Sequence, residues 1–572
     1  MKFFHVYNEE YFEGLVKNNL INEDTGFKIQ HCFAMPKEKK FNRIAAKGGK
    51  LYQMIKEGNY PFYVDRIAGG VTYHEYEYDQ KLIQSYSELL GDWFLGFQLH
   101  ESASNRRASD WQRILEKMGS KGPYDAEALK KVLERSYAVT PEGTILSALS
   151  QDTPEFYATL RYAETHTAYL EEIKDMFVRR MADVGGHILP CDSYYMATKM
   201  QNELGMKTFM PEVGWQIPWM RQAVALARGI AENAGKTWGP YYETWIYRED
   251  SGYSMPCYNT EPGNEWYLSQ ELHPDDFTSY GENGGSSRLL QRRIYYYSLM
   301  SGAHYLAEEW GLNCSYSDMN DFTLSSYGLV KKEFIQATRE IGRVRALVPF
   351  AIVLPKDYSV LELGSYEEDY QLEQYMLSPL SAEEKAYYGH IQKILRLIYA
   401  REGKAYGNEG HVMTNSRFGD LFDMIYEDAG DEIFARYACL IDVTKEGTFA
   451  AAKAGSGLNI LTSRDPEELA ASLHRLEEQV LPCRVDGLHW LLSEGENGSR
   501  YLSIFYNEGN DRNMQTGDRI LSEADRRVKV TLKEAAQLKV VKAFPERVTV
   551  EREDDRTWYV TVPAAGMVIF RY

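Results

Sequence analysis

The sequence has no apolar run that approaches the roughly 20 residues of a membrane-spanning helix. Its first ten residues contain no apolar segment typical of a secretory signal. Only six of the 572 residues are cysteines, and no two of them are spaced as Cys-x-x-Cys. This scarcity argues against a zinc site or a disulfide framework and favours free, buried thiols. We therefore expect a cytoplasmic protein without a cysteine zinc site, and the sequence assigns no metal ligands and no cofactor.

The chain also lacks long basic runs, internal repeats and low-complexity tracts. Its 83 acidic residues outnumber the 64 basic ones, and the formal net charge is −19. Nucleic acids and anionic membranes both select clustered lysine and arginine. We therefore expect neither of them as a partner, and we expect most of the acidic residues to solvate the surface.

Aromatic residues, in contrast, are abundant. They make up 13% of the chain, and 43 of them are tyrosines. A tyrosine combines an apolar ring with a hydroxyl group, so it suits contacts with polyhydroxylated ligands as well as an ordinary core. A chain of this length is too large for a single hydrophobic core, and two to four domains are expected.

Residues 1 to about 345 alternate short apolar runs with helical segments, which is typical of repeated β-α units. We expect eight strands in this region, the number that closes a (β/α)8 barrel. A long, mostly helical insertion at about 102–185 follows the fourth strand, with its clearest helix at Ala158–Asp183. The expected strands are Phe3–Tyr7, Phe27–Met35, Pro61–Ile67, Trp93–Glu101, His187–Ser193, Lys207–Glu212, Thr237–Ile246 and Ala303–Trp310.

Residues 346–485 are expected to form a smaller α/β domain of the flavodoxin type. Its clearest elements are a buried strand at Pro349–Pro355 and a helix at Pro466–Val480. Cys439 lies in the middle of a further expected strand, Arg436–Val443, so we interpret it as a core residue. Residues 486–572 contain only short strands separated by turn residues, which predicts an antiparallel β-sandwich.

Two glutamates lie at the ends of strand-like runs in an aromatic setting. Glu243 lies within Lys236–Tyr247 among five aromatic residues, and Glu101 comes near the end of Trp93–Ser102. Desolvating an unpaired carboxylate is costly, so an acid in such a place is paired, hydrogen-bonded or functional. Two carboxylates and flat apolar faces are what cleavage of a glycosidic bond needs. With the eight-strand count, these two acids end strands four and seven, on opposite sides of a barrel mouth.

We predict that Glu243 is the nucleophile and Glu101 the acid/base of a retaining glycosidase, which requires carboxyl groups about 5–5.5 Å apart. Salt bridges are the structural alternative for both residues. The possible partners are Arg66 or Arg248 for Glu243, and Arg106 or Arg107 for Glu101.

Other residues near strand ends are candidates for substrate contacts, because the active site of such a barrel lies at the C-terminal ends of its strands. Glu308 and Glu309 are rivals, since strand alternation lets only one of them point into the mouth. Each aromatic candidate has the alternative of an ordinary core position. The selected candidates are Arg66, His100, Asp192, Glu212, Trp215, Tyr242, Trp245, Glu308 and Trp310.

The order of these parts resembles glycoside hydrolase family 42, the β-galactosidases whose (β/α)8 barrel precedes an amidotransferase-like α/β domain and a small β domain. The segment Ser287–Trp310 is similar to the family's last barrel helix, the turn after it and the final strand. The resemblance implies Glu243 as nucleophile and Glu101 as acid/base. His100 stands where the family has an asparagine that contacts the sugar 2-hydroxyl, and the family's four-cysteine zinc cluster is not visible.

The sequence therefore predicts a retaining, exo-acting β-glycosidase with a glycoside or oligosaccharide substrate. The resemblance further implies a homo-oligomer, a dimer or trimer, assembled through the second domain. One alternative is a glycosidase of another specificity that uses Glu243 with Glu308. Another is a catalytically silent carbohydrate-binding protein, which the replacement of asparagine by His100 favours.

Overall fold

The computed structural model describes most of the chain. The described residues are 1–7, 12–29, 49–69, 84, 88, 91–100, 103, 166–214, 219–248, 252–254, 284–309, 314–359, 381–399, 412–508, 510–513, 517–520 and 524–572. Among these residues, none of the helices combines the length and the apolar character needed to cross a membrane.

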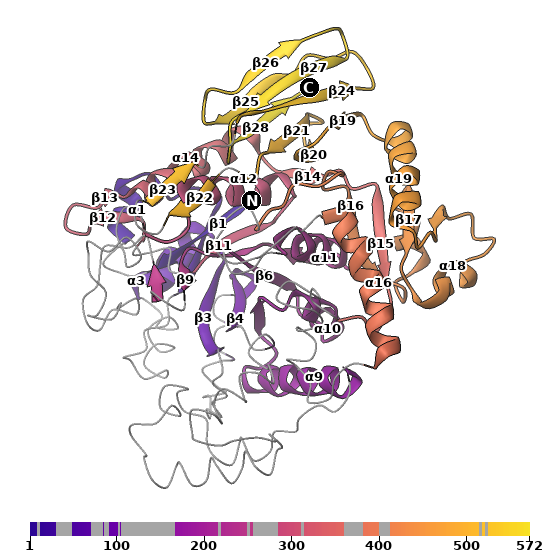
Figure 1. The fold of residues 1–572 in the computed structure, drawn as a ribbon. Helices are drawn as coiled ribbons and strands as arrows, with labels where there is room; N and C mark the ends of the chain where they lie inside the picture. The colour runs from indigo at the N-terminus through magenta and orange to yellow at the C-terminus, as the bar shows by residue number, and fades with distance from the viewer. Residues whose placement is uncertain are drawn as a thin grey trace. The chain divides into compact units, whose positions relative to one another are not determined.

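Eight parallel strands form a closed barrel, as the sequence predicts (Figure 1). Neighbouring strands follow the order of the chain, and the pairing of β5 with β6 completes the ring. A strand is found at each of the eight expected places, while residues 30–35, Glu101 and Trp310 of the expected strands lie outside the described residues. The observed strands are β1 (Lys2–Tyr7), β2 (Thr25–Ile29), β3 (Phe62–Gly69), β4 (Phe94–His100), β5 (Ile188–Asp192), β6 (Thr208–Gly214), β8 (Tyr241–Glu243) and β11 (Tyr305–Glu308). A two-residue strand, β7 (Thr237–Trp238), precedes β8.

Helices alternate with these strands. α12 (Arg288–Met300) and α14 (Ser326–Ile341) begin at serines whose hydroxyl oxygens accept backbone N–H groups of the first turn, a usual way to satisfy a helix start. α9 (His166–Asp183) corresponds to the C-terminal part of the helix expected in the insertion, and residues 102 and 104–165 of the insertion lie outside the described residues. The other helices of this region are α1 (Phe12–Lys17), α3 (Lys50–Gly58), α10 (Thr198–Glu203) and α11 (Met220–Asn233).

The chain divides into two compact units. One comprises Met1–Gly26, Glu212–Tyr358 and Gly389–Tyr572, and it holds β1, β8 and β11 together with the sheets of the C-terminal half. The other comprises Phe27–Pro211 and Ser359–Tyr388, and it holds β3, β4 and β5. The strand β6 runs through the boundary at Pro211, so it contributes residues to both units.

A four-stranded parallel sheet follows the barrel region, in the order β16-β15-β17-β18. β17 contains Cys439, and burial raises the pKa of this thiol to about 12, as expected for a core residue. α19 begins at the cap Asp465, whose carboxylate accepts two backbone N–H groups. The elements are β15 (Phe350–Leu354), α16 (Ala382–Tyr399), β16 (Phe422–Tyr426), α17 (Asp431–Phe434), β17 (Cys439–Asp442), α18 (Thr448–Ala452), β18 (Ile460–Leu461) and α19 (Pro466–Val480). The four cysteines that the structure describes are buried, and none of these four forms a disulfide bond.

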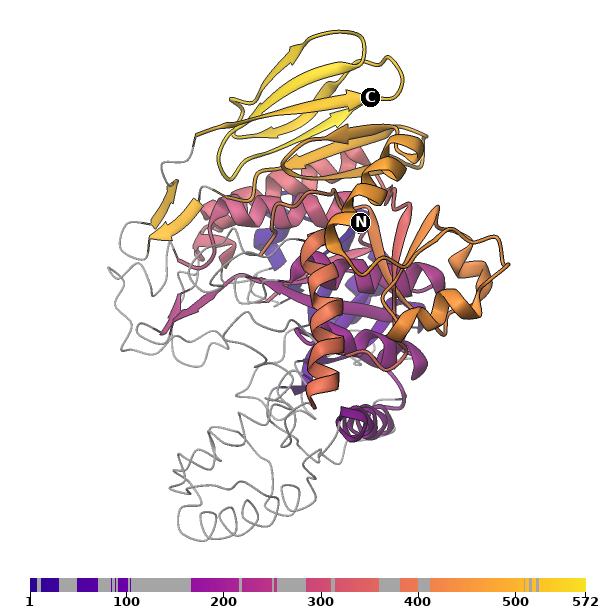
Figure 2. The same cartoon turned by 45° about the vertical axis from the view of Figure 1, so that its right-hand side comes forward.

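Two larger antiparallel sheets and a two-stranded one, formed by β22 (Asn510–Asn513) and β23 (Gly517–Ile520), occupy the C-terminal region (Figure 2). One larger sheet has the strand order β14-β20-β21-β28-β25, and the other has the order β19-β24-β27-β26. β14 comes directly after α14, so the last residues of the expected barrel region pair with this C-terminal sheet. The strands are β14 (Val344–Ala346), β19 (Cys483–Val485), β20 (His489–Gly495), β21 (Arg500–Phe505), β24 (Arg526–Leu532), β25 (Lys539–Phe544), β26 (Thr549–Arg552), β27 (Thr557–Val562) and β28 (Met567–Arg571). The division into three domains with these functions remains a prediction.

Helix α11 packs against strand β16, and buried charges join the two elements. Gly229 permits the close approach, because a Cβ at this position would lie 2.5 Å from the carbonyl oxygen of Met424. Arg228 donates to Asp423 at 2.7 Å within the interior. A second buried pair, Arg221 with Asp420 at 2.8 Å, lies two turns earlier on the same helix. The contact secures the helix that leads directly into β7 and β8.

Candidate functional site

Glu243 is the last residue of β8, and its side chain is only 3% exposed. Strand pairing places it opposite Gly214, the last residue of β6. A Cβ on Gly214 would lie 2.5 Å from the Cβ of Glu243 and 2.8 Å from its Oε2. Gly214 therefore leaves the space that the Glu243 side chain occupies, a role that the sequence did not suggest.

The neighbouring Tyr242 shows which way Glu243 points. The Tyr242 hydroxyl is hydrogen-bonded to the hydroxyl of Ser286, and its ring meets the ring of Tyr295 edge-on, with centroids 6.1 Å apart. Tyr295 belongs to α12, so Tyr242 faces the helix layer. Successive side chains of a strand point to opposite faces, and Glu243 therefore faces the barrel interior.

Glu308, the last residue of β11, is held by a buried network. Its Oε2 lies 2.7 Å from the Nζ of Lys331, and its Oε1 accepts hydrogen bonds from the hydroxyls of Tyr295 and Tyr327. Burial and the nearby carboxylate raise the pKa of both tyrosines well above the usual value, so both remain protonated donors. Lys331 also donates to Ser315 at 2.8 Å. These partners come from α12, α14 and the segment before α14, so Glu308 faces the helix layer.

Glu309 makes a different set of contacts. Its Oε2 accepts a hydrogen bond from the indole N–H of Trp245, and its backbone N–H donates to the carbonyl of Tyr242 at 2.8 Å. Its own carbonyl accepts from the hydroxyl of Thr244 at 3.1 Å. Because Glu308 faces the helices, alternation turns Glu309 to the same side of the sheet as Glu243. The sequence identified these two acids as rivals, but partners distant in the chain decide their orientation.

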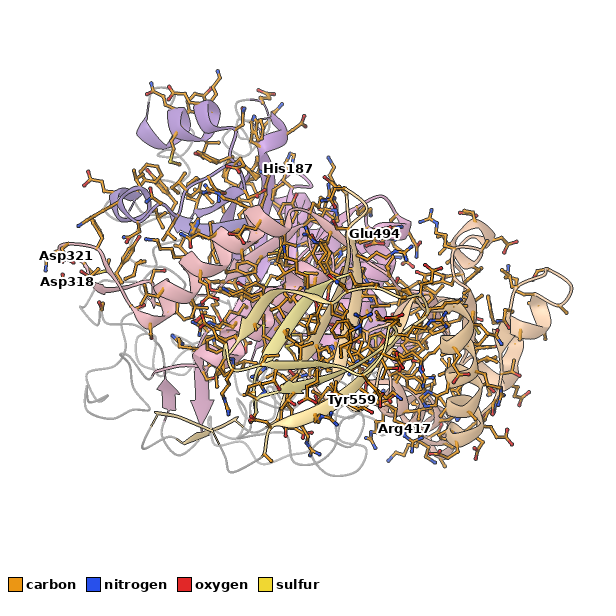
Figure 3. The ribbon with its side chains drawn as sticks, turned by 90° about the horizontal axis from the view of Figure 1, so that it is seen from above. His187, Asp318, Asp321, Arg417, Glu494 and Tyr559 are labelled. Atoms are coloured by element: carbon orange, nitrogen blue, oxygen red, sulfur yellow. The ribbon has the colours of Figure 1, made fainter. Side chains whose placement is uncertain are left out.

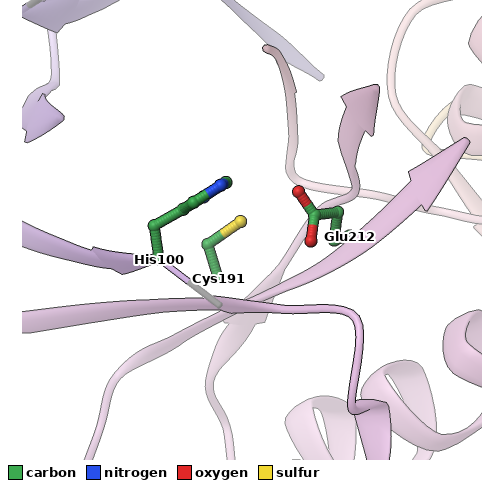
Figure 4. Close-up of side chains that lie close together, drawn as sticks. All are labelled: His100, Cys191 and Glu212. Carbon is green, nitrogen blue, oxygen red and sulfur yellow. The ribbon is translucent and has the colours of Figure 1, made fainter. Parts of the chain in front are cut away.

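His100, Cys191 and Glu212 lie close together on β4, β5 and β6, which are consecutive in the sheet (Figure 4). One donor atom from each residue lies within 4.8 Å of the other two, and all three side chains are buried. Imidazole, thiolate and carboxylate are the donor types that Zn²⁺ takes in proteins. No sequence spacing could have revealed this set, because each residue comes from a different strand.

Asp192, the last residue of β5, has both carboxylate oxygens engaged by backbone groups. The Oδ2 atom accepts from the N–H of Ala103 at 2.6 Å, and the Oδ1 atom accepts from the N–H of Tyr194 at 2.9 Å. In this arrangement the carboxylate fixes the chain that follows the strand. The remaining candidates, Glu101, Trp215 and Trp310, lie outside the described residues, as does the side chain of Arg66, whose backbone belongs to β3.

No protein-family model matches this chain, and no curated protein sequence matches it. Several solved structures are similar to it at low identity. One is alpha-L-fucosidase isoenzyme 2 from Paenibacillus thiaminolyticus, with 12% identity, a TM-score of 0.43, and coverage of 99% of this chain and 96% of that chain. Another is GH5_18 from Streptomyces cattleya in complex with GlcNAc, with 11% identity, a TM-score of 0.29, and coverage of 78% and 90%. A third is the GH51 arabinofuranosidase from Xanthomonas axonopodis pv. citri, with 9% identity, a TM-score of 0.20, and coverage of 91% and 89%. Similarities at this level assign neither a family nor an activity to this chain.

Proposed function

We propose that this protein is a retaining, exo-acting glycoside hydrolase that cleaves a β-glycosidic bond. The observation that carries the proposal is the position of Glu243. It is a buried carboxylate at the C-terminal end of a strand in an eight-stranded parallel barrel, and it faces the interior. In barrels of this type the catalytic groups lie at the C-terminal ends of the strands.

The reaction proceeds by double displacement. A Glu243 oxygen attacks the anomeric carbon while Glu101 donates its proton to the leaving glycosidic oxygen, so a covalent glycosyl-enzyme forms and the aglycone departs. Glu101, now a carboxylate, removes a proton from water. The resulting hydroxide oxygen attacks the anomeric carbon and releases Glu243, and the sugar leaves with its original anomeric configuration.

Contacts around Glu243 favour Glu309 over Glu308 for binding a substrate hydroxyl. Glu309 lies on the Glu243 side of the sheet, and the indole N–H of Trp245 orients its carboxylate. Glu308 is occupied by Lys331 and two tyrosine hydroxyls. This occupancy argues against the alternative in which Glu243 works with Glu308, because an acid/base must exchange its proton with the substrate.

The other residues that the sequence suggested as substrate contacts differ in what supports them. His100 of β4 and Glu212 of β6 are buried polar residues near the C-terminal ends of their strands, a position that suits contacts with sugar hydroxyls. Arg66, Trp215 and Trp310 retain their proposed roles from the sequence alone. Asp192 and Tyr242 would act indirectly, since the first binds backbone N–H groups and the second packs on α12.

β-Galactosides are the first substrates to test, because of the resemblance to glycoside hydrolase family 42. A panel of para-nitrophenyl α- and β-glycosides would be incubated with the wild type, with Glu243→Gln and with Glu551→Gln. Glu551 is an exposed acid of β26 and serves as the matched control. We expect turnover of one β-glycoside that Glu243→Gln loses and Glu551→Gln keeps.

Azide rescue would then test the role of Glu243 itself. In Glu243→Gly, azide can occupy the vacated space and attack the anomeric carbon of an activated β-glycoside, which yields an α-glycosyl azide. Recovery of that product supports a nucleophile. Full activity of Glu243→Gln would overturn the proposal. Saturable binding of a sugar without turnover by the wild type would favour the alternative of a silent carbohydrate-binding protein.

A further inference from the structure

A cleft of about 830 Å³ lies in the unit that contains the C-terminal half of the chain, and Glu243 is not among the residues that line it. Its volume falls within the range of about 300–1,000 Å³ that is usual for small-molecule sites. The walls come from the end of α11, from β14 and the residues after it, from β16, from the segment after α17, from the end of α19, and from residues of the two larger C-terminal sheets. Glu494 of β20, labelled in Figure 3, is one of the lining residues.

The charges that line the cleft cancel. There are four basic and four acidic side chains, so the lining has no formal net charge of its own. The basic residues are Arg345, Arg436, Arg500 and Lys533, and the acidic residues are Glu232, Asp423, Glu494 and Glu534. Two of the acids already have cationic partners: Asp423 pairs with Arg228 at 2.7 Å, and Glu494 pairs with Arg345 at 3.1 Å. The remaining groups offer many hydrogen-bond donors and acceptors.

One wall of the cleft is organised by a chain of hydrogen bonds. Arg436 donates to the Oδ1 of Asn233 at 3.0 Å, and the amide of Asn233 donates to the hydroxyl of Tyr437 at 3.2 Å. Tyr437 in turn donates to Asp423 at 3.0 Å. Polar groups held in this way do not have to be ordered when a ligand binds, which favours affinity.

Apolar surfaces lie between these polar groups. Pro349, Leu481 and Pro482 contribute aliphatic faces, and Tyr437 and Tyr572 contribute aromatic rings. A ligand that matches this lining is neutral, carries many hydroxyl groups and presents C–H faces between them. Those are the properties of a carbohydrate chain.

We propose that this cleft binds a short, neutral oligosaccharide at a site separate from the barrel. The proposal goes beyond the proposed hydrolysis and does not depend on it, because none of its residues takes part in that reaction. Binding would rest on charge-assisted hydrogen bonds from the arginines to sugar hydroxyls and on the contact of sugar C–H faces with the apolar lining.

The test uses isothermal titration calorimetry on the full-length Glu243→Gln protein. The probes are cellotetraose, xylotetraose, maltotetraose and β-1,4-galactotetraose, with anionic tetragalacturonate as the charged comparison. We expect saturable binding of at least one neutral probe. We expect the affinity to fall at least tenfold in Arg436→Ala and in Arg500→Ala, two exposed residues whose replacement leaves the core intact.

Arg417→Ala is the matched control, because Arg417 is an exposed arginine outside the cleft that pairs with Glu467 (Figure 3). Its affinity should equal that of the parent protein. The proposal would be overturned if none of the four neutral probes binds, or if tetragalacturonate binds more tightly than they do. It would also be overturned if binding is unchanged in both Arg436→Ala and Arg500→Ala, since the sugar would then occupy another site. The glycosidase assay has no influence on any of these outcomes.

Discussion

The Cα of Gly214 faces the side chain of Glu243 so closely that a single added methyl group would lie 2.5 Å from the glutamate's Cβ. The two residues end neighbouring, paired strands of the barrel. The Glu243 carboxylate, proposed as the nucleophile, therefore fits only because the residue 29 positions earlier in the sequence is a glycine.

Gly214→Ala should therefore impair catalysis. The added Cβ must displace the Glu243 side chain, and a misplacement of about 1 Å can cost about 100-fold in rate. The measurement is kcat on the best aryl glycoside of the panel. Gly389→Ala is the matched control, because Gly389 lies in α16 with open space around its Cα, so the same change should leave kcat unaltered. Equal activity of Gly214→Ala and the wild type would show that the site does not need this space.

Glu309→Gln and Glu308→Gln should have different consequences. We expect Glu309→Gln to lower kcat/KM by about tenfold or more with little change in stability, because the substrate loses a charge-assisted hydrogen bond worth about 1.5–3 kcal/mol. Glu308→Gln should act mainly on stability, because its carboxylate is bound by Lys331. Kinetics and urea unfolding on both variants separate the two effects, and the reverse pattern would restore Glu308 as the substrate contact.

Removing the cation of the buried pair Lys331–Glu308 should be costly. Lys331→Met leaves a buried carboxylate without its charge partner, and breaking such a pair typically costs about 3–5 kcal/mol. The double variant with Glu308→Gln should recover part of this loss, because no charge then remains. Arg527→Met, which breaks the exposed pair with Glu551, should change the free energy of unfolding by about 0–1 kcal/mol. Denaturant titrations measure the free energy of unfolding of each variant. Similar losses of stability in Lys331→Met and Arg527→Met would contradict the prediction.

His489 should make the fold sensitive to acid. Its Nε2 lies 3.0 Å from Asp420 and its Nδ1 lies 3.0 Å from the amide of Asn507, so the neutral ring can donate to the first and accept from the second. Burial, together with the nearby guanidinium of Arg221, lowers the pKa of His489 to about 4 from the ordinary 6.5, even though Asp420 acts in the opposite direction.

The low pKa of His489 determines how stability depends on pH. Between pH 6.5 and about 4 the unfolded chain protonates this histidine while the folded protein keeps it neutral, so acid favours unfolding. The contribution is fully present above pH 6.5 and falls as the pH drops through that window. The free energy of unfolding of His489→Gln, compared with the wild type across this range, should decline less steeply. If the free energies of unfolding of the two proteins declined equally with falling pH, His489 would not be the source of the acid sensitivity.

Local sequence pattern was sufficient for the strands of the barrel. Short apolar runs identified all eight, because strands such as β2, β5 and β6 are buried on both faces and therefore read as nearly continuous apolar segments. The helix α19 was predicted with its observed bounds, since Asp465 and Pro466 form a start signal that needs no distant partner. The strand β16 was missed, because an aspartate interrupts its short apolar run. Asp423 is tolerated there only because Arg228, from a helix 195 residues away, neutralises it.

In the candidate site, too, the sequence predicted some features and only the tertiary structure decided others. The sequence by itself determined that Glu243 ends a strand in an aromatic setting and that only one of Glu308 and Glu309 can face the barrel mouth. Tertiary structure decided which one. Lys331 and the tyrosines of two helices bind Glu308, and Trp245 binds Glu309. The sequence shows that neighbouring side chains of a strand point to opposite faces, but not which side chain points to which face. That choice depends on the partners that folding brings to each face.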